Sequence, residues 1–389
     1  MAKLIDITGK AISGEWGTDD LVGNGVPVLR TTNFTNIGVV NFNNVVTRQI
    51  VKKSISEKLL RYGDIIIEKS GGSDKQPVGR VVFFEGENNK YLFNNFTGLL
   101  RVRDFCKWNP KYIFYSLFSN YANGGTIPFE NRTTGLHNLQ TDSYVNSVMI
   151  VERKIEEQTD IVTILDKVNQ LINYEKKQLE DLDILVKSRF IEMFGDPVTN
   201  EKGWVKVRLA DKCCIITGNT PPRANEKYYG SYIEWIKSDN ITSSMYLTKA
   251  AEYLSEEGLA VGKKVESGSV LMTCIAGSLK SIGNVAIADR PVTFNQQINA
   301  VVTNEQNTLF MYEQFKLTKE YITCDVNMAL KGILSKGQLS EKQFIFPPIE
   351  LQNQFADFVA QVDKSKLAIQ QSLDELETLK KSLMQQYFG

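Results

Sequence analysis

The chain has 389 residues, of which 42% are hydrophobic and 23% charged, enough for two or three globular domains. No run of about 18 apolar residues could cross a membrane, and the first ten residues lack a signal-peptide layout, so we expect a cytoplasmic protein. The five cysteines show no C-x-x-C spacing, so we expect small buried thiols without disulfides or a zinc site.

The 45 basic and 45 acidic residues balance overall but not locally. The net charge is +4 over residues 1–150 and +2 over 200–345, against −4 over 151–199 and −2 over 346–389. Two mildly basic blocks thus alternate with two acidic ones, which points weakly to a polyanionic partner.

The first block, 1–150, consists of short β-branched runs separated by Gly, Asn and Asp turns, with strands predicted at 65–67 and 78–84. Asn109-Pro110 then begins a helix, because Pro suits the first helical position and residues 113–118 have helical apolar spacing. From Ile161 onward apolar residues recur every three or four positions as far as Met193, which predicts one helix of some 40 residues.

The same plan then repeats. Strands are predicted at 270–272 and 285–287, and a second long apolar periodicity runs from Phe355 to Tyr387. Residues 155–195 and 349–389 align without a gap, and 11 of the 41 positions are identical. The joint before the first helix has Arg153-Lys154 where the second has Pro347-Pro348, which leaves open whether the two joints have the same shape.

We therefore predict an α+β chain with a pseudo-two-fold internal repeat: mixed α/β domains over 1–150 and 199–346, each followed by a long helical segment, 151–198 and 347–389. A 3.5-residue apolar spacing favours packing of the two helices as an antiparallel coiled coil. The alternative is two unrelated surface helices, each lying on its own domain.

Two registers are open to such a pair. If paired residue numbers sum to 541, Glu175 meets Lys366, whereas a sum of 548 sets Glu175 against Leu373 and Lys366 against Leu182. We expect the first register, because a charge facing leucine is costly unless its tip reaches solvent.

Catalytic motifs are missing from the sequence. Asn109-Pro110-Lys111-Tyr112 is a poor match to a methyltransferase base-binding loop, and no G-x-x-x-x-G-K-[ST] motif for a triphosphate is present. Asp64, Glu68 and Lys69 fall on both faces of one predicted strand, which does not suit a nuclease metal cluster. The single histidine, His137, is read as a surface or DNA-facing residue.

Both blocks instead carry loops rich in the side chains that contact phosphates and base edges. Taken singly, each loop is ordinary, but the loops recur at equivalent places of the two copies. The candidate DNA-binding residues are Arg30, Thr31, Thr32, Asn33, Lys69, Ser70, Ser73, Lys75, Arg80, Arg132, Thr133 and His137 in the first copy, and Thr220, Arg223, Lys237, Asn240, Ser278, Lys280, Asn295, Gln296, Gln297 and Lys331 in the second.

The whole chain resembles the specificity subunits of type I restriction-modification enzymes. The resemblance rests on the two-fold plan, on Gly63-Asp64 with its strand, and on four further stretches: 155–158, 193–197 leading to 203–204, 294–297 and 346–352. It implies that each block is a target recognition domain that reads one half of a split double-stranded DNA site, and that the helices are a spacer and a dock for two modification (methyltransferase) subunits. S-adenosylmethionine, ATP and Mg²⁺ would then be bound by the modification and restriction subunits, with no cofactor, metal or catalytic residue in this chain.

Because the reading loops of the two copies differ, we expect two unlike half-sites whose centres lie about one helical turn, 10 to 10.5 base pairs, apart. Two other classes stay open: a stand-alone two-domain DNA methyltransferase or nuclease, and a coiled-coil adaptor that does not bind DNA.

Overall fold

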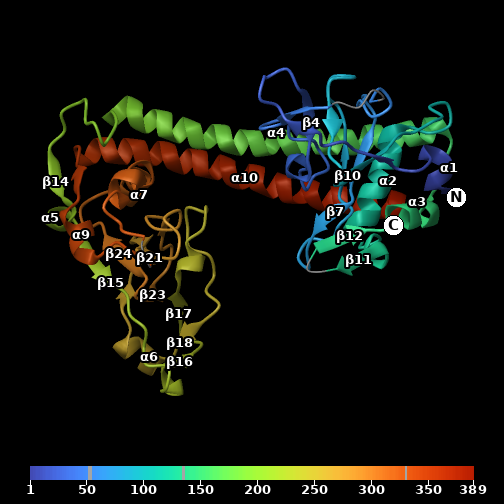
Figure 1. The fold of residues 1–389 in the computed structure, drawn as a ribbon. Coiled ribbons are helices and arrows are strands. Elements are labelled where there is room, and N and C mark those ends of the chain that lie inside the picture. The colour runs from blue at the N-terminus through green and yellow to red at the C-terminus, as the bar shows by residue number, and fades with distance from the viewer. Residues whose placement is uncertain (51–54, 134–135, 329–330) are drawn as a thin grey trace. The chain divides into compact units, whose positions relative to one another are not determined.

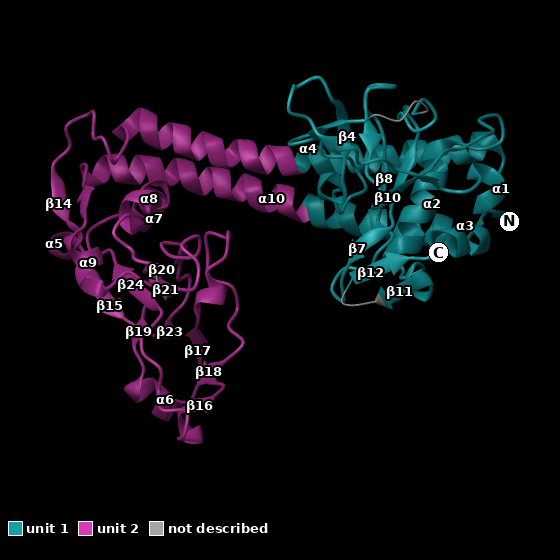
Figure 2. Cartoon of the chain, viewed as in Figure 1, with its two compact units in different colours: residues 1–175, 372–389 teal, residues 176–371 magenta. Residues whose placement is uncertain are grey.

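The structure is a computed structural model that describes residues 1–50, 55–133, 136–328 and 331–389. The chain forms two compact units (Figure 2): residues 1–175 with 372–389 make unit 1, and residues 176–371 make unit 2. The long helices α4 (Ile155–Phe194) and α10 (Ile349–Phe388) each have 40 residues and contribute to both units. The two predicted long helices are therefore confirmed.

The rest of unit 1 is built from short strands and helices (Figure 1). The strands are β1 (Ala2–Lys3), β2 (Ile12–Ser13), β3 (Thr18–Asp19), β4 (Val26–Leu29), β5 (Val46–Gln49), β6 (Ile65–Glu68), β7 (Ser70–Gly72), β8 (Val81–Phe83), β9 (Leu92–Phe93), β10 (Thr97–Leu100), β11 (Glu130–Thr133), β12 (Leu136–Leu139) and β13 (Met149–Ile150). The helices are α1 (Leu4–Thr8), η1 (Thr31–Asn33), α2 (Pro110–Ala122), η2 (Ile127–Phe129) and α3 (Thr141–Ser147). Helix α2 begins as predicted, with Pro110 in its first turn and the Asn109 side chain accepting hydrogen bonds from the backbone of Lys111 and Tyr112.

Unit 2 is likewise built from short strands and helices beside its part of the two long helices. Its strands are β14 (Lys206–Arg208), β15 (Cys214–Thr217), β16 (Tyr229–Gly230), β17 (Ile233–Ile236), β18 (Tyr253–Leu254), β19 (Lys264–Val265), β20 (Val270–Thr273), β21 (Ile275–Ala276), β22 (Val285–Ile287), β23 (Val292–Phe294), β24 (Ile298–Val302), β25 (Gly332–Ile333) and β26 (Gln343–Ile345). The helices are α5 (Leu209–Lys212), η3 (Glu226–Tyr228), η4 (Ser238–Asn240), α6 (Glu256–Val261), α7 (Thr308–Leu317), α8 (Lys319–Thr323) and α9 (Lys336–Glu341).

The strand order is the same in both units. The sheet β2-β10-β6-β8 of unit 1 corresponds to β15-β24-β20-β22 of unit 2, and β3-β5-β4-β9 corresponds to β16-β18-β17-β23, which β19 extends. Each second sheet contains one parallel pair, β4 with β9 and β17 with β23. Unit 1 adds the hairpin strand β11 beside β12 and β7, where unit 2 pairs β21 with β25. The sequence repeat therefore reflects a repeat of local structure.

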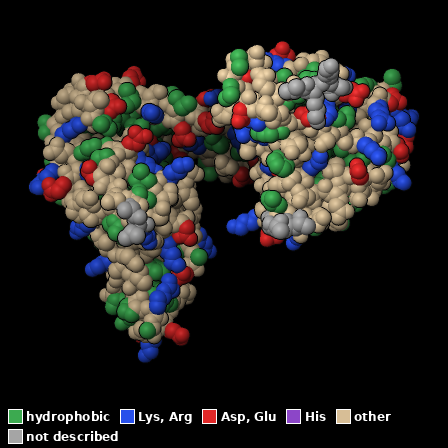
Figure 3. All heavy atoms as spheres, in the orientation of Figure 1, with side chains coloured by type: hydrophobic (Ala, Val, Ile, Leu, Met, Phe, Trp, Pro, Cys, Tyr) green, Lys and Arg blue, Asp and Glu red, His purple; other side chains and the backbone are tan. Residues whose placement is uncertain are grey.

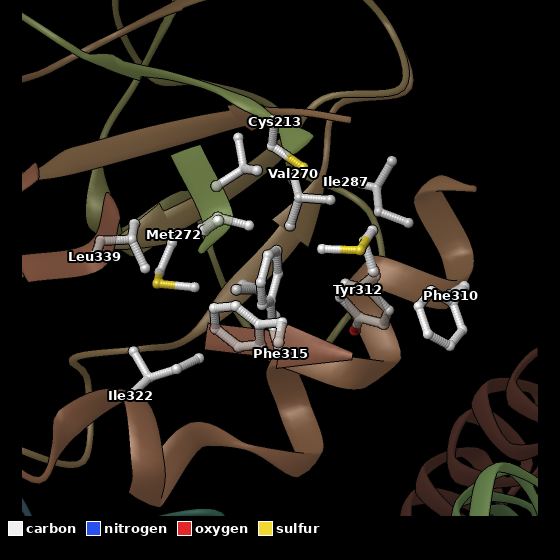
Figure 4. Packing of buried hydrophobic residues seen from close by; sticks show 14 of the residues in the cluster. Cys213, Val270, Met272, Ile287, Phe310, Tyr312, Phe315, Ile322 and Leu339 are labelled. Carbon is white, nitrogen blue, oxygen red and sulfur yellow. The ribbon is translucent and has the colours of Figure 1, made fainter. Parts of the chain in front are cut away.

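Apolar side chains hold α7 and the long helices to the sheet of unit 2. Phe310, Tyr312 and Phe315 of α7 belong to the same buried cluster as Val270 and Met272 of β20, part of which Figure 4 shows. The Phe310 ring also stacks on Phe190 of α4 with 5.5 Å between ring centroids, and Phe190 meets Phe355 of α10 edge-on at 5.3 Å. This cluster fixes the strand-rich part of unit 2 to its stretch of the helices.

The joint between each strand-rich part and its long helix has the same hydrogen bonds in both units. Fully buried Gln158 accepts from the backbone of Asn109 at 2.9 Å and donates to the Arg153 carbonyl at 2.9 Å. Gln352 makes the matching bonds, to the backbone of Asn307 at 3.0 Å and to the Pro347 carbonyl at 2.8 Å. The joints are thus built alike although the first lacks the Pro-Pro pair.

The two long helices run in opposite directions past each other within each unit. In unit 1, Glu175 accepts a hydrogen bond from Ser372 at 2.8 Å, and in unit 2, Lys366 pairs with Asp183 at 2.7 Å. These residue numbers sum to 547 and 549, so the predicted register of 541 was wrong and the alternative near 548 is adopted. The reason is local: one carboxylate oxygen of Glu175 accepts a hydrogen bond from a serine hydroxyl, and the Lys366 ammonium reaches a carboxylate at the helix surface, so the two charges do not meet.

The cysteines only partly follow the prediction. All five are free thiols, but Cys106, Cys214 and Cys324 are exposed, and only Cys213 and Cys274 are buried. Burial raises the pKa of each of these two thiols to about 12, which makes them inert hydrophobic residues. Within the described residues, no helix is long and apolar enough to cross a membrane.

A buried carboxylate on α7 gives a first prediction. Glu313 is 4% exposed, and burial raises its pKa above the usual glutamate value despite Lys316 at 3.2 Å. A raised pKa means that the charged form weakens the fold at pH 7, and that this cost disappears as the pH falls below the unfolded-state pKa. We expect Glu313→Gln to raise the melting temperature at pH 7 and to match the wild type near pH 4.

The matched control is Glu320→Gln, at an exposed glutamate on α8, which should change the melting temperature at neither pH. A Glu313→Gln variant that is less stable than the wild type at pH 7 would contradict the prediction.

Candidate nucleic-acid interface

In unit 2, several predicted residues lie together on two neighbouring turns. Gln296 and Gln297 occupy the turn between β23 and β24; Gln296 accepts a hydrogen bond from Thr220, and the Gln297 side chain accepts from Asn295 at 3.1 Å and from Ser238 at 3.4 Å. Gln296 and Thr220 are exposed. The structure thus brings hydroxyl and amide groups suited to base edges onto one surface.

Two cations lie beside this turn on aromatic rings. Arg223 sits 4.5 Å from the ring centroid of Tyr229 and 5.0 Å from that of Trp235, and the Lys237 ammonium lies 5.2 Å from Trp235. Glu252 bridges the two cations, and its pKa is lowered chiefly by the hydrogen bond from Lys237 and also by the bond from Arg223. The arrangement holds two positive charges in fixed positions at an open surface.

The remaining predicted residues of unit 2 lie around the pairing of β21 with β25. Ala276 is opposite Gly332, so the loop carrying Ser278 and Lys280 lies close to Lys331. All three side chains are exposed, and the Ser278 hydroxyl accepts from the backbone of Lys280 at 3.3 Å. Because Ile275 donates to the Gln297 carbonyl at 3.1 Å, this loop adjoins the Gln296–Gln297 turn.

In unit 1, Arg80 is held by a buried carboxylate. Its guanidinium donates two hydrogen bonds of 2.9 Å to Glu68, which is 2% exposed, and one of 3.4 Å to the Thr31 carbonyl. The hydrogen bonds that Arg80 donates to Glu68 raise the pKa of Arg80. Arg80 is half-buried at the edge of the loop that also carries exposed Thr32, so its position is fixed before any partner arrives.

His137 is not the surface residue that the sequence suggested. It is 6% exposed on β12, where Glu130 approaches Nδ1 at 3.1 Å and Asp74 approaches Nε2 at 3.6 Å. Strand β12 pairs with β11 on one side and with β7 on the other, and this places the His137 side chain in the interior. No strand was predicted from the sequence for this segment. Exposed Arg132 lies next to His137, 3.6 Å from Asp74, and is better placed for a phosphate; the side chain of Thr133 lies outside the described part of the chain.

The other unit 1 residues follow β7 and its loop. Lys69 donates to the Ser13 hydroxyl at 3.0 Å, and burial lowers its pKa. Half-buried Ser70 opens β7, whereas Ser73 and Lys75 are exposed in the turn that follows.

Three predicted asparagines have a structural role instead. Asn33 is 2% exposed; its side chain accepts from the backbone of Arg30 at 3.0 Å and donates to the Asn41 carbonyl at 3.0 Å. Asn240 is 8% exposed and makes the equivalent bond to the backbone of Lys237 at 2.9 Å. Asn295 is also buried. These three side chains fix their loops, because their amides are occupied by hydrogen bonds within the chain.

Sequence reasoning missed several exposed or half-buried residues on the matching surface of unit 1. Asn95 and Phe96 occupy the turn equivalent to Gln296–Gln297, and Trp16 lies 4.3 Å from the Arg48 guanidinium. The alignment of 93–96 with 294–297 could have identified the turn, but an exposed Phe was not counted as a DNA-reading residue.

The surface is open and of mixed charge. Figure 3 shows Lys and Arg side chains of both units among Asp and Glu side chains on the face drawn. A cavity of about 720 Å³ near α5 and α9 contains none of the predicted residues. Among the described residues, no group of three or more His, Cys, Asp or Glu side chains could hold a metal ion. The candidate site is therefore suited to a large polar partner.

Both strand-rich parts share one strand order and carry loops with exposed polar and basic side chains. Residues 201–378 match the family model described as a type I restriction modification DNA specificity domain.

Individual proteins are similar to the chain in sequence or in fold. The chain is 31% identical over 118 residues to the type I restriction enzyme HindI specificity subunit of Haemophilus influenzae, an alignment that covers 30% of this chain and 25% of that protein. Its fold is similar to the S subunit of the type I restriction-modification system of M. genitalium, with a TM-score of 0.61, 14% identity, and coverage of 100% of this chain and 95% of the other. A second solved chain, from work on assembly and conformational transition of the type I R-M system, gives a TM-score of 0.57 at 15% identity, covering 100% of this chain and 96% of the other.

Proposed function

We propose that the chain is the DNA specificity subunit of a type I restriction-modification complex and reads a bipartite, asymmetric double-stranded site, one half per unit. The observation that carries the proposal is the shared strand scaffold of the two units with different side chains at equivalent turns: Asn95–Phe96 in one, Gln296–Gln297 in the other. A repeated scaffold with altered loops suits two independent readers of different sequences. The family match over 201–378 supports the same role.

The chain acts in this proposal without catalysing a reaction itself. The long helices pack as an antiparallel coiled coil, separate the two readers and dock two modification subunits, through which restriction subunits join. Those partners bind S-adenosylmethionine, ATP and Mg²⁺. The complex works on DNA in the cytoplasm.

The test is to purify the chain with and without its modification subunits and to supply DNA and labelled S-adenosylmethionine. Methyl transfer should require the partners, and sequencing of the methylated positions should give two unlike half-sites with centres about 10 to 10.5 base pairs apart. Methylation by the chain alone would support a stand-alone methyltransferase, and a palindromic or continuous site would contradict the two-reader arrangement. No salt-dependent DNA binding at all would leave only an adaptor role.

Phosphate contacts give a second prediction. Lys280 and Lys331 are exposed lysines beside the reading turn of unit 2, so each neutralises phosphate without reading sequence. We expect Lys280→Ala and Lys331→Ala each to weaken binding to all DNA sequences alike and to lower the slope of log K against log salt by about 1. Fluorescence anisotropy at several salt concentrations measures both quantities.

Lys212→Ala is the control, because this exposed lysine ends α5 beside the cavity that contains no reading residue. Its salt slope should equal that of the wild type. A lysine variant whose affinity falls for one sequence only would show that the residue reads bases.

A further inference from the structure

The turn at Asn95–Phe96 is held in place by the same backbone bonds as the turn at Gln296–Gln297. The backbone N–H groups of Lys69 and Ser70 donate to the Phe96 carbonyl at 2.8 and 3.2 Å. Those of Cys274 and Ile275 donate to the Gln297 carbonyl at 2.7 and 3.1 Å. Phe96 and Gln297 are therefore equivalent positions of one scaffold.

A close backbone approach fixes the segment beside each turn. A Cβ added at Gly14 would lie 2.1 Å from the Asn94 carbonyl oxygen, and one at Gly218 would lie 2.2 Å from the Asn295 carbonyl oxygen, so only glycine fits at either place. Two residues further on, Trp16 corresponds to Thr220. The surroundings of the two turns thus match in the backbone and differ only in side chains.

The chemistry of the two turns is different. In unit 2 the turn is polar throughout, since Gln296 is bonded to Thr220 and Gln297 to Ser238. In unit 1, Asn95 is exposed and the Phe96 ring is 53% exposed. Because Phe96 stays 53% exposed after folding, it removes little apolar area from water, so a core role does not explain it.

We propose that Asn95 and Phe96 read A·T pairs in the half-site of unit 1, an inference that rests on the function proposed above. An asparagine amide matches the N6 donor and N7 acceptor of adenine in the major groove, and an exposed aromatic ring matches the 5-methyl group of thymine. The fixed backbone of the turn presents both side chains without an ordering cost on binding. The corresponding Gln296–Gln297 turn has no apolar side chain, so of these two turns only the one in unit 1 can contact a thymine methyl group.

The experiment removes one recognition group of the DNA at a time, either a thymine methyl group or an adenine N7 acceptor. Using the complex with its modification subunits, each thymine of the methylated site is replaced in turn by uracil, which lacks the 5-methyl group but pairs identically. We expect one thymine of the unit 1 half-site at which uracil weakens wild-type binding about 4-fold, the effect of one buried methyl group. Replacing an adenine of the same half-site by 7-deazaadenine, which lacks the N7 acceptor, should weaken binding about 10-fold.

Protein variants then assign each effect to a residue. Phe96→Ala should bind thymine and uracil duplexes equally, and Asn95→Ala should lose the 7-deazaadenine effect only. Phe105→Ala is the matched control, because Phe105 is a 61% exposed phenylalanine in a different loop of unit 1 and should behave as the wild type. Since Phe96 and Phe105 are both exposed, neither change should impair folding.

Two outcomes separate the inference from the proposed function. If the wild-type complex binds its site specifically but no uracil substitution in the unit 1 half-site matters, or if Phe96→Ala keeps the uracil effect, the reading role of this turn is overturned and the proposed function stands. If the wild-type complex shows no site-specific binding, the proposed function fails and the inference fails with it.

Discussion

Replacing Arg101 with Met is expected to destabilise unit 1 by about 3 kcal/mol, because it leaves the buried carboxylate of Asp64 without its ion-pair partner. Asp64 is 2% exposed and accepts two hydrogen bonds of 2.7 Å from Arg101, whose guanidinium also donates to the Leu59 carbonyl at 2.8 Å. Removing one partner of a buried ion pair costs about 3 to 5 kcal/mol. Because the Arg101 side chain is 20% exposed, we expect a cost at the lower end of this range. Urea denaturation with hydrogen exchange at β6 and β10 measures the effect in unit 1.

The double variant Asp64→Ser with Arg101→Met tests the cause. Ser269, buried at 2%, occupies the place of Asp64 in unit 2: its carbonyl accepts from Ala288 at 2.9 Å, as that of Asp64 does from Phe84 at 2.8 Å. The scaffold therefore tolerates serine, and removing both charges should restore most of the lost stability. If the double variant is as unstable as Arg101→Met alone, the lost packing of the arginine stem is responsible instead.

The parts of the fold that follow from periodicity were predictable from the sequence. Apolar spacing was enough to place α4 and α10, and Pro110 after Asn109 marked the start of α2, because each signal acts within a few turns of the chain. The register of the helix pair was not predictable by matching Glu175 with Lys366. A long charged side chain has several partners within reach of its tip, and in the structure Lys366 pairs with Asp183.

Some features of the candidate site could also be predicted from the sequence, and others could not. Selecting polar residues in loops picked out Thr220, Gln296 and Lys237, whose loops lie together because they follow strands of one scaffold. It also chose Asn33, whose amide is occupied by backbone groups, and His137, which lies buried in its own β11–β12 hairpin. Residue type cannot separate a loop-fixing asparagine from a base-reading one, because both need the same donors and acceptors. The same selection left out Phe96, because an apolar residue stands out as a candidate only when the structure shows that it is exposed.

Exchange of residues 200–345 for the corresponding block of a relative is expected to change the second half-site completely and to leave the first unchanged. Binding to the original site should fall by about 10³-fold or more, toward the non-specific level, because half of the sequence-reading contacts would be lost. The cut points suit such an exchange. Among the described residues, strands β14 and β26 pair with each other and both lie inside the block, so the exchange divides none of the described sheets.

The exchanged block must also fit the helices that stay behind. Phe310, inside the block, stacks on Phe190 and meets Phe355, while Gln352 of α10 donates to Gln306 at 2.8 Å and accepts from the backbone of Asn307. A donor with Phe and Asn at the positions of Phe310 and Asn307 should therefore give a stable hybrid, whereas one with a small residue at the position of Phe310 should lose about 3 to 5 kcal/mol. Sequencing of methylated positions gives both half-sites of the hybrid at once. A stable hybrid whose first half-site also changes would show that the two units do not read DNA independently.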